Sequence, residues 1–83
     1  MLNIKVLGPG CNNCHMVEEV ARAAVAAVGV EAEFEKVTDR AKFAEYGLLY
    51  TPGLVINEKL VAAGRIPKES EVQAWVVNAL AVA

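Results

Sequence analysis

Cys11 and Cys14, which are separated by two asparagines, are the candidates for reactive residues in this chain because of their type and spacing. Along a helix, side chains three residues apart return to nearly the same face. The two sulfurs can therefore close a small disulfide ring with little backbone movement. Such a pair indicates either reversible thiol oxidation or metal binding.

The position of the pair favours redox chemistry. Residues 3–7 are rich in aliphatic side chains and end at Gly8-Pro9-Gly10, so they predict a strand that passes into a helix at the cysteines. We expect Cys11 at the helix N-terminus, where the unpaired N–H groups and the helix dipole stabilise a thiolate. Cys11 then attacks a substrate disulfide, and Cys14, one turn inward and less exposed, resolves the mixed disulfide.

Metal binding is the alternative use of the same pair. A zinc site usually needs four ligands, whereas the chain offers two Cys and a single His, His15, so zinc would require a second chain. Cu(I) needs only two thiolates and is the stronger competitor. His15 could also tune the thiols, but a partly exposed residue in the first helical turn is the simpler interpretation.

Composition restricts the remaining functions. The chain has 83 residues with formal net charge -2 and only 8 Lys and Arg, which disfavours nucleic-acid binding. Its longest apolar run, residues 23–30, is far shorter than the roughly 18 residues that indicate a membrane span. The first residues do not resemble a secretory signal. We expect a single cytoplasmic domain over residues 1–83.

The periodicity of the sequence predicts seven elements. After the first strand, a helix over residues 13–28 ends at Gly29, and alternation over residues 30–35 indicates an edge strand. A short helix capped by Thr38 or Asp39 runs to Tyr46, and residues 53–56 and 60–63 form a hairpin. A last amphipathic helix follows Pro67. In the first helix, the apolar positions expected to face the core are Met16, Val20, Ala23, Ala24 and Ala27.

The predicted order, β-α-β-α-β-β-α, indicates an α/β fold. A parallel strand pair joined by a right-handed helical crossover and followed by a hairpin gives a four-stranded mixed sheet with three helices on its faces.

Several motifs together resemble one family. They are the opening from Gly8 to Cys14, the Thr51-Pro52 step before Leu54-Val55-Ile56-Asn57, and Gly64-x-x-Pro67 before the last helix. With them the chain resembles, over nearly its whole length, the small redox-active disulfide proteins of the thioredoxin-like (thioredoxin and glutaredoxin) superfamily. The resemblance implies a minimal thioredoxin-like fold and a thiol-disulfide oxidoreductase without metal or cofactor.

The resemblance also implies a substrate site and partners. In that family the proline of the Thr-Pro step is cis and lies beside the active disulfide, so Thr51 and Pro52 are expected to bind substrate. The expected partners are protein or small-molecule disulfides and a thioredoxin-reductase-type electron donor, with no nucleic acid and no membrane.

The chain departs from ordinary thioredoxins in three places. Gly10 replaces the tryptophan before the first cysteine, Asn12-Asn13 replaces Gly-Pro, and Lys5 stands where a buried acid is usual. Lys5 either supports a thiolate, if it points toward the cysteines, or is solvated. A glutaredoxin-like enzyme ranks below this interpretation because residues 60–64 lack the glutathione-capping pattern, and an interaction module ranks last.

Overall fold

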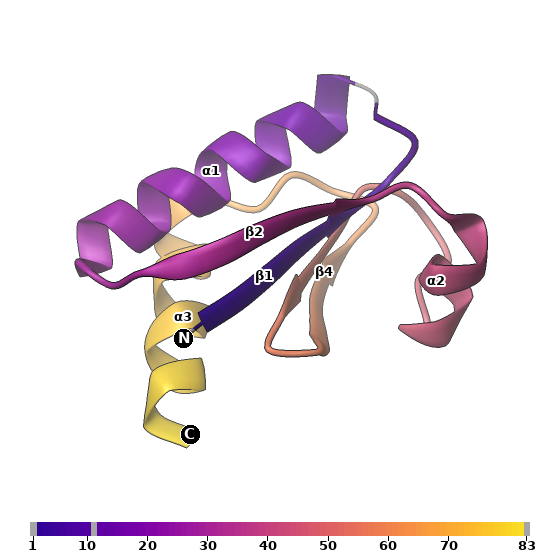
Figure 1. Cartoon of the computed structure of the whole chain (residues 1–83). Coiled ribbons are helices and arrows are strands. Elements are labelled where there is room, and N and C mark those ends of the chain that lie inside the picture. The colour runs from indigo at the N-terminus through magenta and orange to yellow at the C-terminus, as the bar shows by residue number, and fades with distance from the viewer. Residues whose placement is uncertain (1, 11, 83) are drawn as a thin grey trace.

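The computed structural model describes residues 2–10 and 12–82, and Figure 1 shows the arrangement of the elements. They are β1 (Leu2–Leu7), α1 (Asn12–Val28), β2 (Ala32–Val37), α2 (Arg40–Glu45), β3 (Gly53–Ile56), β4 (Lys59–Ala63) and α3 (Glu69–Val82). This order is the one that the sequence predicts. Asp39 caps α2, since its Oδ1 accepts a hydrogen bond from the Ala41 N–H at 2.9 Å.

The four strands form one mixed sheet in the order β2-β1-β3-β4. β1 runs parallel to β2, with Leu7 opposite Val37, and antiparallel to β3, with Leu7 opposite Gly53 and Ile4 opposite Ile56. The carboxyl end of β1 therefore lies beside the beginning of β3. This places the Gly8–Cys14 segment and the Thr51-Pro52 step at the same end of the sheet, although about 40 residues separate them in the sequence.

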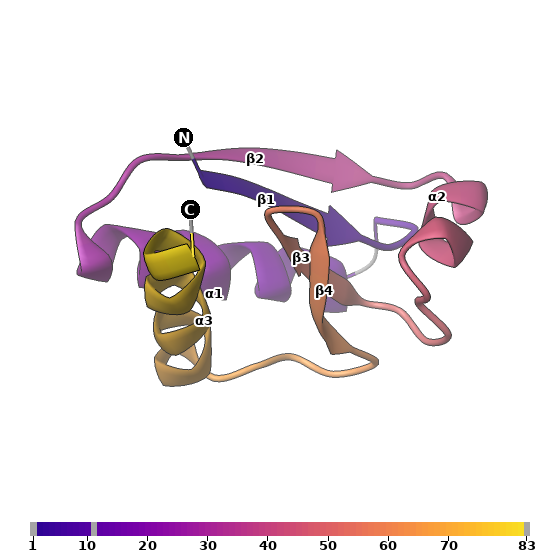
Figure 2. The same ribbon diagram turned by 90° about the horizontal axis from the view of Figure 1, so that it is seen from below.

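One face of the sheet is covered by α1 and α3. Ile4 of β1 and Ile56 of β3 point to this face and pack against Val17 of α1 and Val76 of α3 in the larger of two apolar clusters. In both Figure 1 and Figure 2, α3 crosses α1 at the end of the sheet away from α2. The described residues buried between the sheet and these two helices are all apolar.

The opposite face carries only the short helix α2. Side chains alternate between the two faces along a strand, so Leu7 of β1 and Val55 of β3 point to this face. They pack with Phe43 and Leu48 in a second, smaller cluster. Phe43, in the middle of α2, is buried. Because α2 covers only part of this face, the rest is available to polar side chains.

The core-facing side of α1 differs from the prediction. The buried residues are Cys14, Val17, Ala21, Ala24 and Val25. Met16, Ala23 and Ala27 are exposed, so the expected face was wrong at those positions, and Val20 is only partly buried. Ala and Val side chains occupy two adjoining sides of this helix. The side that includes Cys14 is the one that packs against Ile4 and Val76 and is buried.

The hairpin between β3 and β4 turns at Asn57 and Glu58, whose φ angles are 49° and 68°. A two-residue turn of the I′ type requires positive φ at both positions, which asparagine tolerates and glutamate rarely adopts. Two hydrogen bonds tie Asn57 to the first strand: Asn57 N–H donates to the Asn3 carbonyl at 2.8 Å, and Asn3 N–H donates to Asn57 Oδ1 at 2.9 Å. The turn is thereby fixed against β1.

Candidate redox site

Cys14 lies at the junction between β1 and α1, packed against the backbone of Gly8. Its side chain belongs to the larger apolar cluster, and the residue is only 6% exposed, as expected for the inner cysteine. A Cβ placed on Gly8 would overlap Cys14 Sγ and would lie 3.9 Å from Thr51 Cβ. The absence of a side chain at residue 8 therefore lets the Cys14 sulfur approach the main chain next to Thr51.

Cys11, the predicted nucleophile, lies outside the described residues. The residue after it, Asn12, begins α1, a helix of 17 residues. The first N–H groups of such a helix lack intrahelical partners and carry the positive end of its dipole. This end of α1 is thus an environment that favours thiolates over thiols.

The Thr51-Pro52 step reaches the same place from the other side of the sheet. The peptide bond between the two residues is cis, as the family resemblance implied. Pro52 is buried, and its carbonyl accepts a hydrogen bond from Gly64 N–H at 2.8 Å, whereas Thr51 is exposed. The structure therefore brings Thr51 close to Gly8 and Cys14 and leaves it open to a ligand.

An apolar shelf adjoins Thr51. Leu49 and Tyr50 are 85% and 73% exposed, which is unusual for side chains of this size. Together with Pro9 and Thr51 they line a shallow cavity of about 470 Å³. This surface continues from the redox site toward α2.

A second cavity, of about 240 Å³, lies beside Cys14 on the side of β2. His15 and Lys36 both line it. His15 is exposed, and its Nε2 lies 3.2 Å from Glu19 Oε1. Lys36 was not singled out from the sequence, because its place opposite Val6 follows from the parallel register of β1 and β2, which the sequence does not state.

Glu18, one turn beyond Cys14 on α1, joins Lys36 to the helix. Arg22 Nε donates to Glu18 Oε2 at 2.9 Å, and Lys36 Nζ lies 3.3 Å from Glu18 Oε1. Glu18 and Arg22 are four residues apart on the helix, and the Glu18 side chain in this pair is largely buried. Its hydrogen bond with Arg22 and then its contact with Lys36 lower the pKa of Glu18.

Lys5, at the position where ordinary thioredoxins carry an acid, points away from Cys14. It lies on the α2 face of β1 and is held in a network with the end of α2 and the hairpin turn. Lys5 Nζ donates to Glu58 Oε1 at 2.6 Å and to the Tyr46 hydroxyl at 2.8 Å. Neither expectation for Lys5 describes this arrangement, because the side chain is neither solvated nor directed at the thiols.

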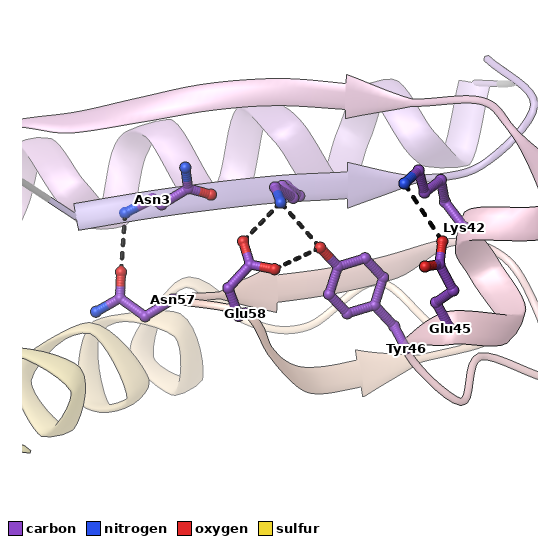
Figure 3. A network of polar contacts seen from close by, with 7 residues as sticks. Asn3, Lys42, Glu45, Tyr46, Asn57 and Glu58 are labelled. Carbon is purple, nitrogen blue, oxygen red and sulfur yellow. Dashed lines mark hydrogen bonds and ion pairs between the residues drawn. The ribbon is translucent and has the colours of Figure 1, made fainter.

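Tyr46 completes the network on the α2 face. Its hydroxyl donates to Glu58 Oε2 at 2.7 Å, and Figure 3 shows the ring directed at the Glu58 carboxylate. The hydrogen bond to Glu58, and then that to Tyr46, raise the pKa of Lys5, while the pKa of Glu58 is lowered by Lys5 first. The network is therefore a charged brace that joins three elements, and it is separate from the thiol site.

The described part of the chain has no group of three or more His, Cys, Asp or Glu side chains placed to hold a metal ion. Within the same residues, no helix is both long and apolar enough to cross a membrane.

Comparison with known proteins agrees with the fold and the site. The model of the thioredoxin domain family matches residues 2–77, so the chain belongs to that family of redox proteins. A thioredoxin of Methanothermobacter thermautotrophicus is 40% identical over 73 residues, which cover 88% of this chain and 95% of that protein. A thioredoxin of Methanocaldococcus jannaschii is 36% identical over 73 residues, covering 88% of this chain and 84% of that protein. The chain is thus a thioredoxin-like protein, and these relationships favour redox chemistry over the copper or zinc alternative.

Proposed function

We propose that the chain is a dithiol-disulfide oxidoreductase in which Cys11 is the attacking thiolate and Cys14 the resolving thiol. The observation that carries the proposal is the position of Cys14, which is buried at the start of α1 against Gly8 and beside Thr51. A buried thiol is poorly placed to meet a large substrate but is well placed to attack a sulfur three residues earlier in the chain.

The reaction proceeds through two exchanges. The Cys11 thiolate attacks one sulfur of the substrate disulfide, that S–S bond breaks, and the departing sulfur leaves with the electron pair and takes a proton from solvent. Cys14 then loses its proton and attacks the Cys11 sulfur, which releases the second substrate sulfur. The substrate gains two electrons and two protons, and the chain is left with a Cys11–Cys14 disulfide.

Thr51 and Pro52 form the substrate platform in this proposal. Thr51 is an exposed residue whose backbone can pair with an extended peptide, and the neighbouring Leu49 and Tyr50 offer apolar contact. Protein and small-molecule disulfides are the substrates, and a thioredoxin-reductase-type dithiol restores the reduced form. A cytoplasmic location remains a prediction from the sequence.

A trapping experiment tests the assignment of the two cysteines. Cys14→Ser should accumulate a mixed disulfide between Cys11 and a peptide disulfide, because the intramolecular attack is removed. Cys11→Ser is the matched control and should form no adduct. Mass spectrometry after acid quenching gives both results. Turnover by Cys14→Ser at the wild-type rate would contradict the two-cysteine mechanism.

A redox titration separates this function from metal handling. Equilibration in dithiol-disulfide buffers, with alkylation and mass analysis, should give one two-electron midpoint between about -290 and -180 mV. A protein that forms no intramolecular disulfide but binds Cu(I) tightly at one equivalent would instead be a metal carrier.

A further inference from the structure

A cavity lies between the β3–β4 hairpin and α3, at the end of the sheet opposite to the thiols. Its volume is about 360 Å³, and its lining residues are Ile56, Asn57, Lys59, Val61, Trp75, Asn78 and Ala79. Ile56 pairs with Ile4 near the beginning of β1, whereas Gly8 and Cys14 follow the end of that strand. The cavity is therefore separate from the redox site.

The walls of this cavity are apolar. Ile56 is buried, and Val61, Trp75 and Ala79 are partly buried and pack against the larger cluster. The guanidinium group of Arg65 lies over the Trp75 ring, with its Cζ 6.0 Å from the ring centroid. Arg65 itself is bound by Glu71 through two hydrogen bonds, at 3.0 and 2.9 Å, so it is engaged within the protein.

Two polar side chains at the cavity, Asn57 and Lys59, offer hydrogen-bond donors. Asn57 Oδ1 accepts the Asn3 N–H, and the side-chain nitrogen of Asn57 points away from Asn3, as Figure 3 shows. This nitrogen can therefore donate a hydrogen bond to a ligand. Lys59 is exposed and forms no ion pair with the described residues. The carboxylate nearest in sequence, Glu58, is held on the opposite face by Lys5 and Tyr46 and does not neutralise Lys59.

No aspartate or glutamate is among the described residues that line the cavity. An occupant therefore meets an ammonium group and an amide N–H at the rim and an indole with aliphatic side chains within. A carboxylate satisfies the two donors, and an apolar ring suits the walls. The volume is near the lower limit of about 300 Å³ for small-molecule sites, which restricts the occupant to roughly one ring with a short chain.

We propose that this cavity binds a small carboxylate with an aromatic or branched apolar body. Lys59 and Asn57 hold the carboxylate, and Trp75, Val61 and Ala79 contact the apolar part. The site is independent of disulfide exchange, because none of its residues belongs to the thiol site or the Thr51-Pro52 platform.

The single tryptophan of the chain provides a direct measurement. In a ¹⁵N-labelled sample the indole N–H of Trp75 gives one resonance, which should shift with saturation as 4-phenylbutanoate is added. The side-chain amides of Asn57 and Asn78 should shift along the same binding curve. A Trp75 resonance that moves linearly without saturation, or not at all, overturns the proposal.

Charge recognition is tested with a matched ligand and a matched variant. The neutral amide, 4-phenylbutanamide, should bind about tenfold more weakly, and Lys59→Gln should weaken 4-phenylbutanoate by a similar factor, because each removes one charge-assisted contact. Lys42→Gln is the control, since Lys42 lies on α2 and contacts Glu45 at 3.4 Å. Equal binding of acid and amide, or unchanged binding by Lys59→Gln, contradicts the assignment of the carboxylate.

A second variant tests the cavity itself. Ala79→Leu adds a branched side chain to a partly buried wall position and should abolish the saturable shift of Trp75. Retention of binding by a folded Ala79→Leu protein would place the ligand elsewhere. The disulfide-exchange rate of each variant should equal that of the wild type, so failure of this proposal is distinguishable from failure of the redox function.

Discussion

The two faces of the sheet are stabilised in different ways. On one face, α1 and α3 cover β1 and β3 with an apolar cluster that includes the Cys14 side chain. On the other, α2 covers only Leu7, Val55 and their neighbours, and the Lys5–Tyr46–Glu58 network lies on the same face. The buried thiol is thus placed on the face with the more extensive packing, and the charged brace is kept on the other.

This difference indicates a division of roles between the faces. Close packing fixes side chains in single rotamers, which a reacting sulfur requires if it is to meet its partner in a defined geometry. Exposed ion pairs add little stability, but they can fix the position of a short helix and a strained turn. The following variants, in order of decreasing expected effect, test that division.

The largest effect is expected from truncation of the two cores. Ile4 and Leu7 are both fully buried, on opposite faces of β1. Ile4→Ala should lower the free energy of unfolding by about 4 kcal/mol, toward the upper part of the range for such changes. Leu7→Ala should cost about 2 to 3 kcal/mol, because the short helix α2 can move to reduce the cavity. Urea unfolding measures both free energies. A loss for Leu7→Ala that equals or exceeds the loss for Ile4→Ala would contradict the proposed difference between the two faces.

The next effect compares two glycines. A Cβ on Gly8 meets the sulfur of Cys14, whereas a Cβ on Gly53 meets the end of the flexible Leu48 side chain on the α2 face at 2.7 Å. Gly8→Ala should therefore cost about 1 to 3 kcal/mol and slow formation of the intramolecular disulfide. Gly53→Ala should cost less and leave that rate unchanged. Urea unfolding curves measure the stability, and quenching by alkylation at successive times measures the rate of disulfide formation. Similar losses of stability and rate in both variants would contradict the comparison.

A smaller effect is expected from the charged brace. Tyr46→Phe removes the hydroxyl that bonds to both Lys5 and Glu58, so the thermal midpoint should fall, but by less than in Gly8→Ala. The pKa of Glu58 should rise, since a hydrogen bond that lowers it is lost. Tyr50→Phe, at an exposed position, is the control and should change neither quantity. Carbon-detected NMR titration of the Glu58 carboxyl group follows the pKa.

The smallest effect concerns acid stability. Arg65, and then the Lys68 N–H, lower the pKa of Glu71 from 4.5 to about 2. The unfolded chain therefore takes up this proton first as the pH falls, so the stabilisation is complete above pH 4.5 and disappears toward pH 2. Glu71→Gln should flatten the loss of stability over this interval. Urea unfolding at several pH values tests this, and parallel curves for the two proteins would show that Glu71 contributes nothing.

Much of the fold could be predicted because local signals and long-range pairing agree. Gly29, which the sequence places at the end of the first helix, adopts positive φ, and the alternation after it corresponds to an edge strand. The face of α1 could not be read in the same way. An Ala- and Val-rich helix offers two apolar stripes of similar strength, and only contacts with β1 and α3 distinguish them.

The site was predictable in part. The motif located Cys14 and the Thr51-Pro52 step, and the structure brings both to Gly8. The partners of Lys5 were not predictable, because Tyr46 and Glu58 follow it by 41 and 53 residues and reach it only through the antiparallel pairing of β3 and the return of α2. Contacts between exposed polar side chains leave no periodic pattern in a sequence.

The contact between Gly8 and Cys14 has an evolutionary consequence. The space that a side chain at residue 8 would occupy already contains the sulfur of residue 14, so the cost of a substitution at residue 8 depends on the residue at position 14. A larger residue at position 8 fits once residue 14 loses its sulfur, but the proposed dithiol chemistry is then lost as well. As long as selection maintains that chemistry, the sulfur of Cys14 also constrains a glycine outside the Cys-x-x-Cys motif.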